Sequence, residues 1–417
     1  MFHFPRLLGR QLEAALTDTP AILVTGARQV GKSTLVRNCV PGAAYVTLDD
    51  QLEESAARSD PAGFLDRHSA PTLVIDEIQR APALMQALKL SIDRDRRPGA
   101  FVLTGSADIL MLPRVSESLA GRMDVLILRP FAQLEVTGRA LPTGTFVDII
   151  FAKTKLPQWR RHIGRTQMFE RMLVGGYPES RTRVDARRRL AWFRSYVAEL
   201  LQREVRDIAR VADLARLSRL LALVAARSTQ PINKARLASD LGLSWNTVDT
   251  YLAILQTMFL IIDVGAWSRS SNARISRHGK ILVSDSGLAG SLLGLERETV
   301  LESGTPLGSL VETFVGNELL RLQSGTSFDF ELLHYRTQRG EEVDFVIEQR
   351  GGALVGIEVK ASATVTAADF RGIDALRRDA GEDFVRGVVL YTGENTASFG
   401  DERYAVPISA LWDEPTR

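Results

Sequence analysis

The sequence has little cysteine and no long apolar run. Cys39 is the single cysteine among 417 residues, which excludes an internal disulfide and a cysteine-based metal cluster. No stretch reaches the ~18 consecutive apolar residues that mark a membrane-spanning helix. Residues 1–16 also lack the uninterrupted apolar segment of a secretory signal peptide. These absences predict a soluble, cytoplasmic protein without a membrane partner.

The whole chain has almost no excess of charge of one sign, but one segment has a large positive excess. The net charge is +2, and a charged content of 24% is ordinary for a globular protein. Residues 153–210, however, contain 15 Lys or Arg and 6 Asp or Glu, a local net charge of +9. Such a segment can hold a polyanion such as DNA or RNA, although solvated helix faces are often rich in arginine too.

A phosphate-binding loop stands near the start of the chain. The stretch AILVTGARQVGKSTLV combines an apolar strand, a glycine-containing turn and the start of a helix, and it fits the pattern G-x-x-x-x-G-K-[ST]. Glycines let backbone N–H groups surround phosphate oxygens, and the helix directs its positive end at the anion. The expected ATP-binding residues are Gly26, Ala27, Arg28, Gln29, Val30, Gly31, Lys32, Ser33 and Thr34. Of these, Lys32 would neutralise the β- and γ-phosphates during catalysis, and Ser33 would bind Mg²⁺.

Two further strands end in polar residues. TLVIDEIQR is a short apolar strand that ends in Asp76 and Glu77. An acid at this position can hold the Mg²⁺ shell, and the following glutamate can activate the attacking water. The next strand, FVLTGS, carries Thr104 and Ser106 where a γ-phosphate sensor would lie. Simple turn chemistry is the alternative explanation of these two hydroxyls.

One arginine has the placement of a residue that acts between subunits. In SLAGRMDV, Arg122 directly precedes the next predicted strand, where ring-forming ATPases present an arginine to the γ-phosphate of a neighbouring subunit. We therefore expect Arg122 to be catalytic and the protein to form a homo-oligomer. A surface arginine in a salt bridge is the alternative.

These motifs, taken in order, resemble the AAA+-type, archaeal-like P-loop ATPases. LVGGYPES at 173–180 and YVAELLQREVRDI at 196–208 add to the resemblance, which covers essentially the whole chain. In that family the ATPase is fused to a C-terminal domain of uncharacterised function that resembles PD-(D/E)xK nucleases. The resemblance implies ATP binding and the fold, but not the biological process.

A helix-turn-helix is predicted in INKARLASDLGLSWNTVDTYLAILQTMFLI. Asn233 can cap a first helix that ends near Leu241, Gly242 suits a left-handed stop, and Ser244 can cap the second helix. The apolar run that follows fits the start of a wing. The exposed face carries Asp249 and neither lysine nor arginine, so a packing or dimerisation module remains an alternative to DNA binding.

The stretch EEVDFVIEQRGGALVGIEVKAS carries the candidate second site. It places Asp344 on one strand, and alternation puts Glu358 and Lys360 on a common face of the next. Two carboxylates can bind Mg²⁺ or Mn²⁺, and a lysine can orient water or stabilise a pentavalent phosphorane. The resemblance implies a helix acid as the third ligand, with Glu312 preferred and Glu318 second.

Cleavage by this second site is left open by the sequence. The D…ExK pattern is frequent by chance, and Val343 replaces the proline of the motif's name. Domains of this fold also serve as inactive nucleic-acid binders.

The sequence thus predicts an α/β multidomain protein. Its parts are a P-loop AAA+-like parallel-sheet domain at 1–134, a helical lid or connector at 135–214, a winged-helix-like domain at 215–270 and an α/β PD-(D/E)xK nuclease-like domain at 271–417. We expect an ATPase that uses ATP and Mg²⁺ and acts on nucleic acid. The alternative is a nucleotide-dependent switch whose C-terminal domain binds a partner without cutting.

Overall fold

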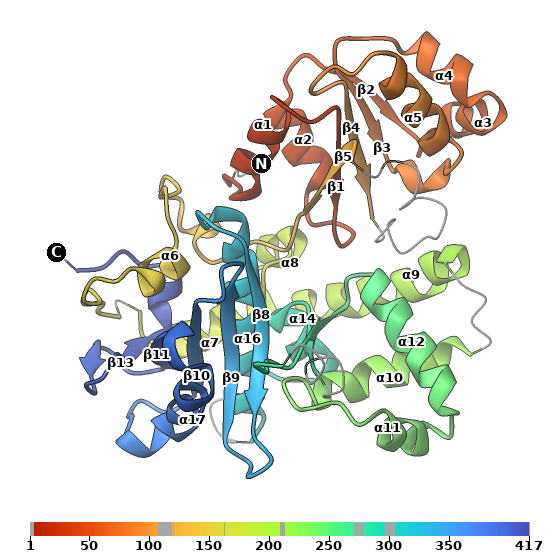
Figure 1. The fold of residues 1–417 in the computed structure, drawn as a ribbon. Helices are drawn as coiled ribbons and strands as arrows, with labels where there is room; N and C mark the ends of the chain where they lie inside the picture. Colours follow the sequence, from red (N-terminus) through yellow and green to blue (C-terminus); the bar gives the residue numbers. More distant parts are fainter. Residues whose placement is uncertain are drawn as a thin grey trace. The chain divides into compact units, whose positions relative to one another are not determined.

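The structure is a computed structural model, and it divides the chain into two compact units. It describes residues 4–106, 119, 121–161, 163–208, 213–270, 274, 279–296 and 305–416. The first unit is Met1–Pro130 with Thr257–Phe259, and the second is Phe131–Gln256 with Leu260–Arg417 (Figure 1). The finer boundaries at 134, 214 and 270 stay predictions. None of the described helices is long and apolar enough to span a membrane.

The first unit is built on a parallel five-stranded sheet in the order β2-β3-β4-β1-β5. The central strands β1, β3 and β4 are buried along their whole length, as expected where helices cover both faces of a parallel sheet. The strands are β1 (Ala21–Thr25), β2 (Ala44–Thr47), β3 (Leu73–Asp76), β4 (Phe101–Gly105) and β5 (Met123–Ile127). The α-helices are α1 (Leu8–Ala15), α2 (Lys32–Cys39), α3 (Gln51–Ser59), α4 (Pro61–Arg67) and α5 (Leu84–Arg94), and a short 3-10 helix, η1, spans Ile78–Arg80. The predicted parallel sheet is confirmed.

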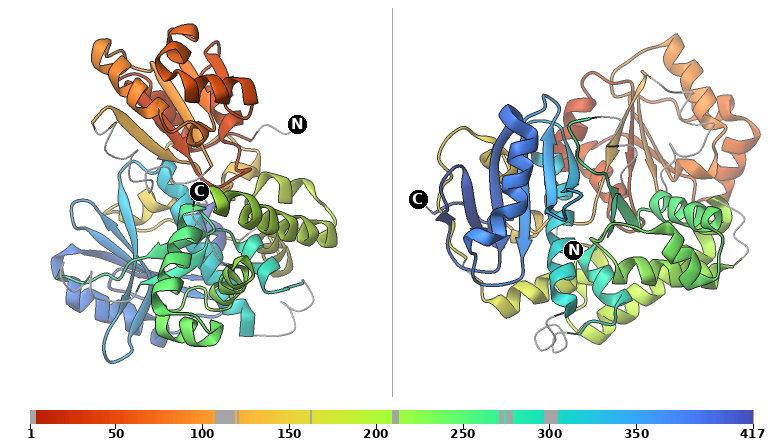
Figure 2. Two further views of the ribbon diagram at one scale, coloured as in Figure 1. Left: turned by 90° about the vertical axis from the view of Figure 1, so that its right-hand side faces the viewer. Right: turned by 60° about the horizontal axis from the view of Figure 1, so that its bottom comes forward.

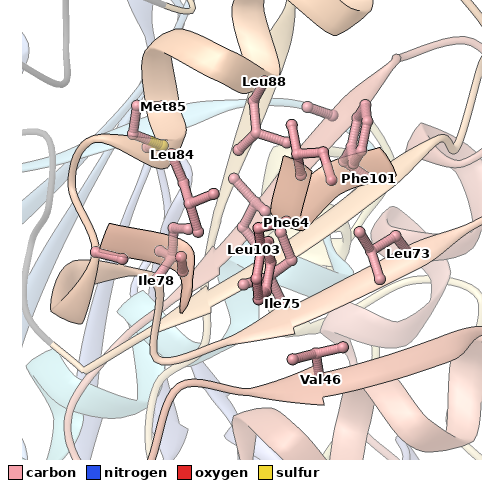
Figure 3. Packing of buried hydrophobic residues seen from close by; sticks show 14 of the residues in the cluster. Val46, Phe64, Leu73, Ile75, Ile78, Leu84, Met85, Leu88, Phe101 and Leu103 are labelled. Atoms are coloured by element: carbon pink, nitrogen blue, oxygen red, sulfur yellow. The ribbon is translucent and has the colours of Figure 1, made fainter. Parts of the chain in front are cut away.

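One hydrophobic core of the first unit lies between the sheet and helices α4 and α5. Ile75 and Leu103 from neighbouring strands pack against Phe64 of α4 and Leu88 of α5, as Figure 3 shows. All four side chains are almost completely buried. Truncation of one such leucine to alanine costs about 2–5 kcal/mol of stability, so this packing holds β3 and its terminal acid firmly in place.

The second unit begins with helices and a two-stranded hairpin. Asn233 caps α11, where its Oδ1 accepts a hydrogen bond from the Arg236 backbone N–H at 2.9 Å, and Gly242 ends that helix at φ 61°. The predicted cap at Asn233 and the predicted left-handed stop at Gly242 are confirmed. The elements in chain order are α6 (Phe146–Phe151), α7 (Arg165–Val174), α8 (Pro178–Thr182), α9 (Ala186–Ile208), α10 (Leu214–Ala226), α11 (Lys234–Leu241), α12 (Trp245–Thr257), the antiparallel pair β6 (Ile261–Val264) and β7 (Lys280–Val283), and α14 (Ser286–Leu292).

The second unit ends in a six-stranded mixed sheet in the order β12-β13-β11-β10-β9-β8. Figure 2 shows this sheet in blue from two further sides. Strands β8, β9 and β10 are antiparallel neighbours, whereas β10, β11 and β13 run parallel. The elements are α16 (Thr305–Leu322), β8 (Phe330–Arg336), β9 (Glu342–Gln349), β10 (Leu354–Lys360), α17 (Arg371–Ala380), β11 (Phe384–Tyr391), β12 (Ala397–Ser398) and β13 (Arg403–Pro407). The chain thus has a second, separate sheet domain, as the sequence predicts.

Candidate functional site

The phosphate-binding loop joins β1 to α2 and needs its glycines for steric reasons. Gly26 has φ 145° and Gly31 has φ 97°, both in the left-handed half of backbone space. A Cβ atom at Gly26 would overlap the carbonyl oxygen of Leu128. Glycine at these two positions therefore lets the chain turn tightly from the strand into the helix, whose first N–H groups point at the loop.

Lys32 closes over this loop. Its side chain is buried, and its ammonium donates hydrogen bonds of 2.9 Å to the carbonyl oxygens of Gly26 and Ala27. A buried ammonium held by neutral carbonyls can exchange these partners for phosphate oxygens, which bind it more strongly because they carry charge. Of the other expected loop residues, Ala27 and Val30 are buried, Arg28 is half-buried, and Gln29 and Thr34 are exposed.

The structure brings Ser33, Asp76 and Thr104 together. The Ser33 hydroxyl lies 3.1 Å from each carboxylate oxygen of Asp76, and the Thr104 hydroxyl donates a hydrogen bond to the same carboxylate. Asp76 is only 7% exposed, so these hydroxyl groups, rather than water, lie around its carboxylate. Asp76 and Thr104 come from strands that share the sheet, and Ser33 comes from the first turn of α2.

A fourth group in this cluster was missed by sequence reasoning. The Tyr45 hydroxyl on β2 donates a hydrogen bond of 2.5 Å to Asp76. Burial, together with the nearby Asp76 carboxylate, raises the pKa of Tyr45 to about 12, so the hydroxyl remains a proton donor at neutral pH. The guanidinium of Arg37 lies 4.1 Å from the centre of the tyrosine ring. The available signal was a tyrosine on the first strand after the loop, which pairs with the strand that carries Asp76.

Glu77 occupies an unusual backbone conformation next to this cluster. Its φ of 59° lies in the left-handed region, which is uncommon for a residue with a side chain. Its N–H donates to the Thr104 hydroxyl at 3.3 Å, and the Gln79 amide donates to its carboxylate. Gln79 also reaches the Ser106 hydroxyl at 3.0 Å. Gln79, a second residue that the sequence did not single out, therefore orients Glu77 and Ser106 together.

Arg122 is engaged within its own unit. Its Nε lies 2.6 Å from Oδ1 of Asp93 on α5. Hydrogen bonding to this guanidinium lowers the pKa of Asp93. The pair is partly exposed, and solvent and salt screen such surface pairs so that they add little to stability. An arginine held this weakly can exchange its partner.

The candidate residues of the second unit meet at one cavity of about 1030 Å³. Glu312 from α16, Asp344 from β9 and Glu358 from β10 all line it. The Val359 N–H donates to Asp344 Oδ2 at 2.8 Å, and the Lys360 ammonium lies 2.8 Å from Glu358 Oε1. The predicted convergence of these side chains is therefore present in the geometry.

Glu318, the other candidate helix acid, lies elsewhere. It is fully buried, pairs with Arg321 at 2.8 Å and accepts the Gln133 N–H at 2.7 Å. Arg321 in turn reaches Asp285 at 2.7 Å. Glu312 rather than Glu318 thus lines the cavity, while Glu318 belongs to a buried ion network that ties α16 to residue 133.

A buried lysine that sequence reasoning missed lies among the acids of the cavity. Lys280 on β7 is 1% exposed, and its Nζ lies 2.7 Å from Glu342, 3.2 Å from Glu312 and 3.5 Å from Asp344. These carboxylates raise its pKa, so it remains charged. The only signal in the sequence was a lysine that opens an otherwise apolar strand, KILV.

Two of the cavity acids resist ionisation. Burial, and then repulsion from the Asp344 carboxylate, raises the pKa of both Glu312 and Glu358 to about 8. Oε2 of Glu358 is buried and accepts no hydrogen bond.

Across the described part of the chain, no three His, Cys, Asp or Glu side chains are grouped so that they could hold a metal ion.

The first unit has the fold and loop of a P-loop nucleotide-binding domain of the AAA class. Residues 18–137 of the chain match the family described as "AAA domain", so the chain carries an AAA-type P-loop ATPase domain. Residues 165–299 match "Domain of unknown function (DUF8612)", and residues 307–411 match "Domain of unknown function (DUF4143)".

Similar proteins extend along nearly the whole chain. The "Uncharacterized protein Rv2008c" of Mycobacterium tuberculosis is 29% identical over 404 residues, which cover 96% of this chain and 83% of that protein. "Uncharacterized protein Mb2031c" of Mycobacterium bovis shows the same identity and coverage. Among solved structures, the Walker-type ATPase PABY2304 of Pyrococcus abyssi is 16% identical with a TM-score of 0.42, over 68% of this chain and 94% of that one. The assignment of the first unit rests on the AAA match and on the loop geometry.

Proposed function

We propose that the protein is an ATPase that binds ATP with Mg²⁺ at the loop of residues 26–34 and hydrolyses it. The observation that carries this proposal is the Ser33 hydroxyl 3.1 Å from both oxygens of Asp76, beside the buried ammonium of Lys32. A hydroxyl and a carboxylate are oxygen ligands of the kind that Mg²⁺ prefers, and two protein ligands are its usual number beside phosphates. The residues present therefore fit the ion.

Each residue has a defined task in this proposal. Ser33 and Asp76 hold Mg²⁺, which when bound neutralises charge on the β- and γ-phosphates. Lys32 leaves the carbonyls of Gly26 and Ala27 and binds phosphate oxygens. Glu77 accepts a proton from the attacking water, while Thr104 orients the Asp76 carboxylate and lies where a sensor of the γ-phosphate is needed.

The left-handed backbone at Glu77 supports its assignment as the base. Such a conformation costs on the order of 1 kcal/mol and persists where the surroundings impose it, commonly at functional sites. Replacement by glutamine keeps the shape and removes the base. Glu77→Gln should bind ATP normally but hydrolyse it about a hundredfold more slowly or worse. Glu13→Gln, on the exposed surface of α1, is the matched control, and undiminished turnover in Glu77→Gln would remove the assigned role.

Action on nucleic acid is our second candidate function. The helix pair α11–α12 followed by the β6–β7 hairpin has the element order of a winged helix. Trp245 is half exposed there, with the Lys234 ammonium 5.5 Å from its ring, and an exposed aromatic beside a cation suits base stacking. The run α16–β8–β9–β10–α17–β11, with acids on its first helix and two strands, supports a PD-(D/E)xK nuclease-like fold.

The experiment for this candidate uses plasmid DNA and structured RNA with Mg²⁺ or Mn²⁺. Cleavage by wild type that is lost in Lys360→Ala would establish a second, metal-dependent active site at Asp344, Glu358 and Glu312. Binding of either nucleic acid without cleavage would favour the non-cutting domain. If the protein neither binds nor cleaves either nucleic acid, this candidate function is wrong.

A nucleotide-dependent switch is the alternative for the whole protein. In that case ATP controls the assembly of a homo-oligomer, and the second unit binds a partner without cutting. The absence of a metal-holding group among the described residues supports this alternative. Light scattering with and without a non-hydrolysable ATP analogue discriminates, because only the switch requires that nucleotide binding alone changes the size of the assembly.

A further inference from the structure

The cluster of acids in the second-unit cavity already includes a cation, the ammonium group of Lys280. Lys280 Nζ lies within 3.5 Å of three carboxylates, those of Glu312, Glu342 and Asp344. Its side chain is 1% exposed, whereas the side chains of its three partners are 14–31% exposed. A buried ammonium with three acidic partners is a fixed charge, because removing it leaves the acids buried and uncompensated.

The backbone of β7 holds this lysine in place. Lys280 pairs with Val264 in the β6–β7 ladder and forms a bridge with Pro231 on its other side. The preceding residue, Gly279, accepts the Ile232 N–H at 3.1 Å, and a Cβ atom there would press against Asp263. Strand β7, which pairs with other backbone segments on both of its edges, thus holds Lys280 next to the acids.

Several carboxylate oxygens of this cluster already pair with a lysine or a backbone N–H group, while Oε2 of Glu358 accepts no hydrogen bond. The Lys280 ammonium pairs with Glu312 Oε1 and Asp344 Oδ1. The Val359 N–H donates a hydrogen bond to Asp344 Oδ2, and the Lys360 ammonium pairs with Glu358 Oε1. A divalent ion needs several of these oxygens at about 2.0–2.6 Å, a space that the ammonium occupies. As arranged, the residues do not fit a metal ion, in agreement with the lack of a metal-holding group among the described residues.

We propose that Lys280 is the permanent cation of this cluster and stands where a metal-dependent phosphodiesterase holds its ion. The second unit then works without a metal of its own and binds its ligand without cutting it. This inference deepens the second candidate function and rests on the acid cluster being its site. It does not depend on ATP hydrolysis, which is measured separately with Glu77→Gln.

Lys280→Met tests the proposal because it removes the charge and keeps most of the side-chain volume. Without nucleotide, calorimetric titration with Mn²⁺ should show no saturable binding to wild type in the second unit. Lys280→Met should bind one Mn²⁺ per chain saturably, since the freed carboxylate oxygens become available. Lys234→Met, which removes another lysine paired with a carboxylate in the same unit, should gain nothing. The double variant Lys280→Met/Asp344→Asn should lose the gain.

Thermal unfolding covers the case in which Lys280→Met is too unstable for calorimetry. Mn²⁺ should then raise its melting temperature by roughly 5 °C and leave that of wild type unchanged, because a ligand that binds only the folded state stabilises it. Lys280→Gln should respond in the same way. Equal Mn²⁺ binding by wild type and Lys280→Met would overturn the proposal, and so would no Mn²⁺ effect on either variant. A purely structural ion pair predicts that last outcome.

Discussion

The hydroxyl of Ser33 and the carboxylate of Asp76 are 43 positions apart in sequence and 3.1 Å apart in space. One comes from the first turn of α2, the other from the end of β3, and the parallel sheet sets both at its carboxyl edge. Ligands of open α/β sheets bind at this edge. Ser33 and Asp76 are therefore the residues that would hold magnesium in the proposed ATPase.

Tyr45 should matter to this arrangement although it was not expected from the sequence. Tyr45→Phe removes the hydrogen bond to Asp76 and keeps the ring beneath Arg37. We expect the free energy of unfolding of the first unit to fall by about 1 kcal/mol, the usual net value of one such bond or slightly more for a charged acceptor. Chemical denaturation followed by circular dichroism measures this. No change in stability, together with an unchanged Mg²⁺ requirement, would show that Tyr45 only fills space.

Arg122 gives a prediction about assembly. If it leaves Asp93 to reach the γ-phosphate of a neighbouring subunit, ATP turnover per chain should rise with protein concentration. Arg122→Ala should lower turnover by about a thousandfold and abolish the concentration dependence. Asp93→Asn, which removes the resting partner, serves as the control and should retain both. If turnover does not depend on protein concentration and is retained in Arg122→Ala, then Arg122 only forms a surface salt bridge.

The acid cluster predicts a pH dependence of stability. The pKa values of Glu312 and Glu358 are raised from an ordinary 4.5 to about 8, so in this window the folded chain binds protons that the unfolded chain has lost. Stability of the second unit should therefore decrease as pH rises from about 4.5 to about 8. All five tryptophans lie in that unit, so their fluorescence during denaturation reports on it alone. Glu358→Gln should flatten the decrease, and an unchanged slope would contradict the assignment.

The buried ion network around Arg321 should be important for folding rather than for chemistry. Glu318→Gln leaves the Arg321 guanidinium with the Asp285 carboxylate as its remaining charged partner in the network, at 2.7 Å. Loss of one partner of a buried pair costs about 3–5 kcal/mol. Tryptophan fluorescence in urea measures the loss, and Glu331→Gln, on the exposed side of β8, is the control. A loss no greater than that of the control would mean that the network is not tightly coupled.

The parts of this molecule that follow from local sequence could be predicted, and those that depend on side chains from distant strands could not. The loop at 26–34 and the caps at Asn233 and Gly242 are local, because each depends on residues a few positions apart. Glu358 and Lys360 could be placed on a common face of β10 by strand alternation. In contrast, Lys280 opens an otherwise apolar strand, and nothing near it in sequence shows which acids it meets. Tyr45 meets Asp76 only through the pairing of β2 with β3, which local sequence does not specify.

The choice between Glu312 and Glu318 shows the same limit. Both stand on α16, six residues apart, and the periodicity of a helix separates their faces without saying which face meets the sheet. Packing decides it, since Glu318 is enclosed with Arg321 while Glu312 opens to the cavity.

Calorimetric titration of the purified chain with ATP, with and without Mg²⁺, tests the central claim most directly. We predict that one ATP binds per chain, more tightly with Mg²⁺, and that Lys32→Ala weakens binding by roughly a hundredfold, about 2.7 kcal/mol, while Lys89→Ala on α5 does not. If wild type takes up no ATP when the metal is supplied, the loop is not a nucleotide site and the proposed ATPase is wrong.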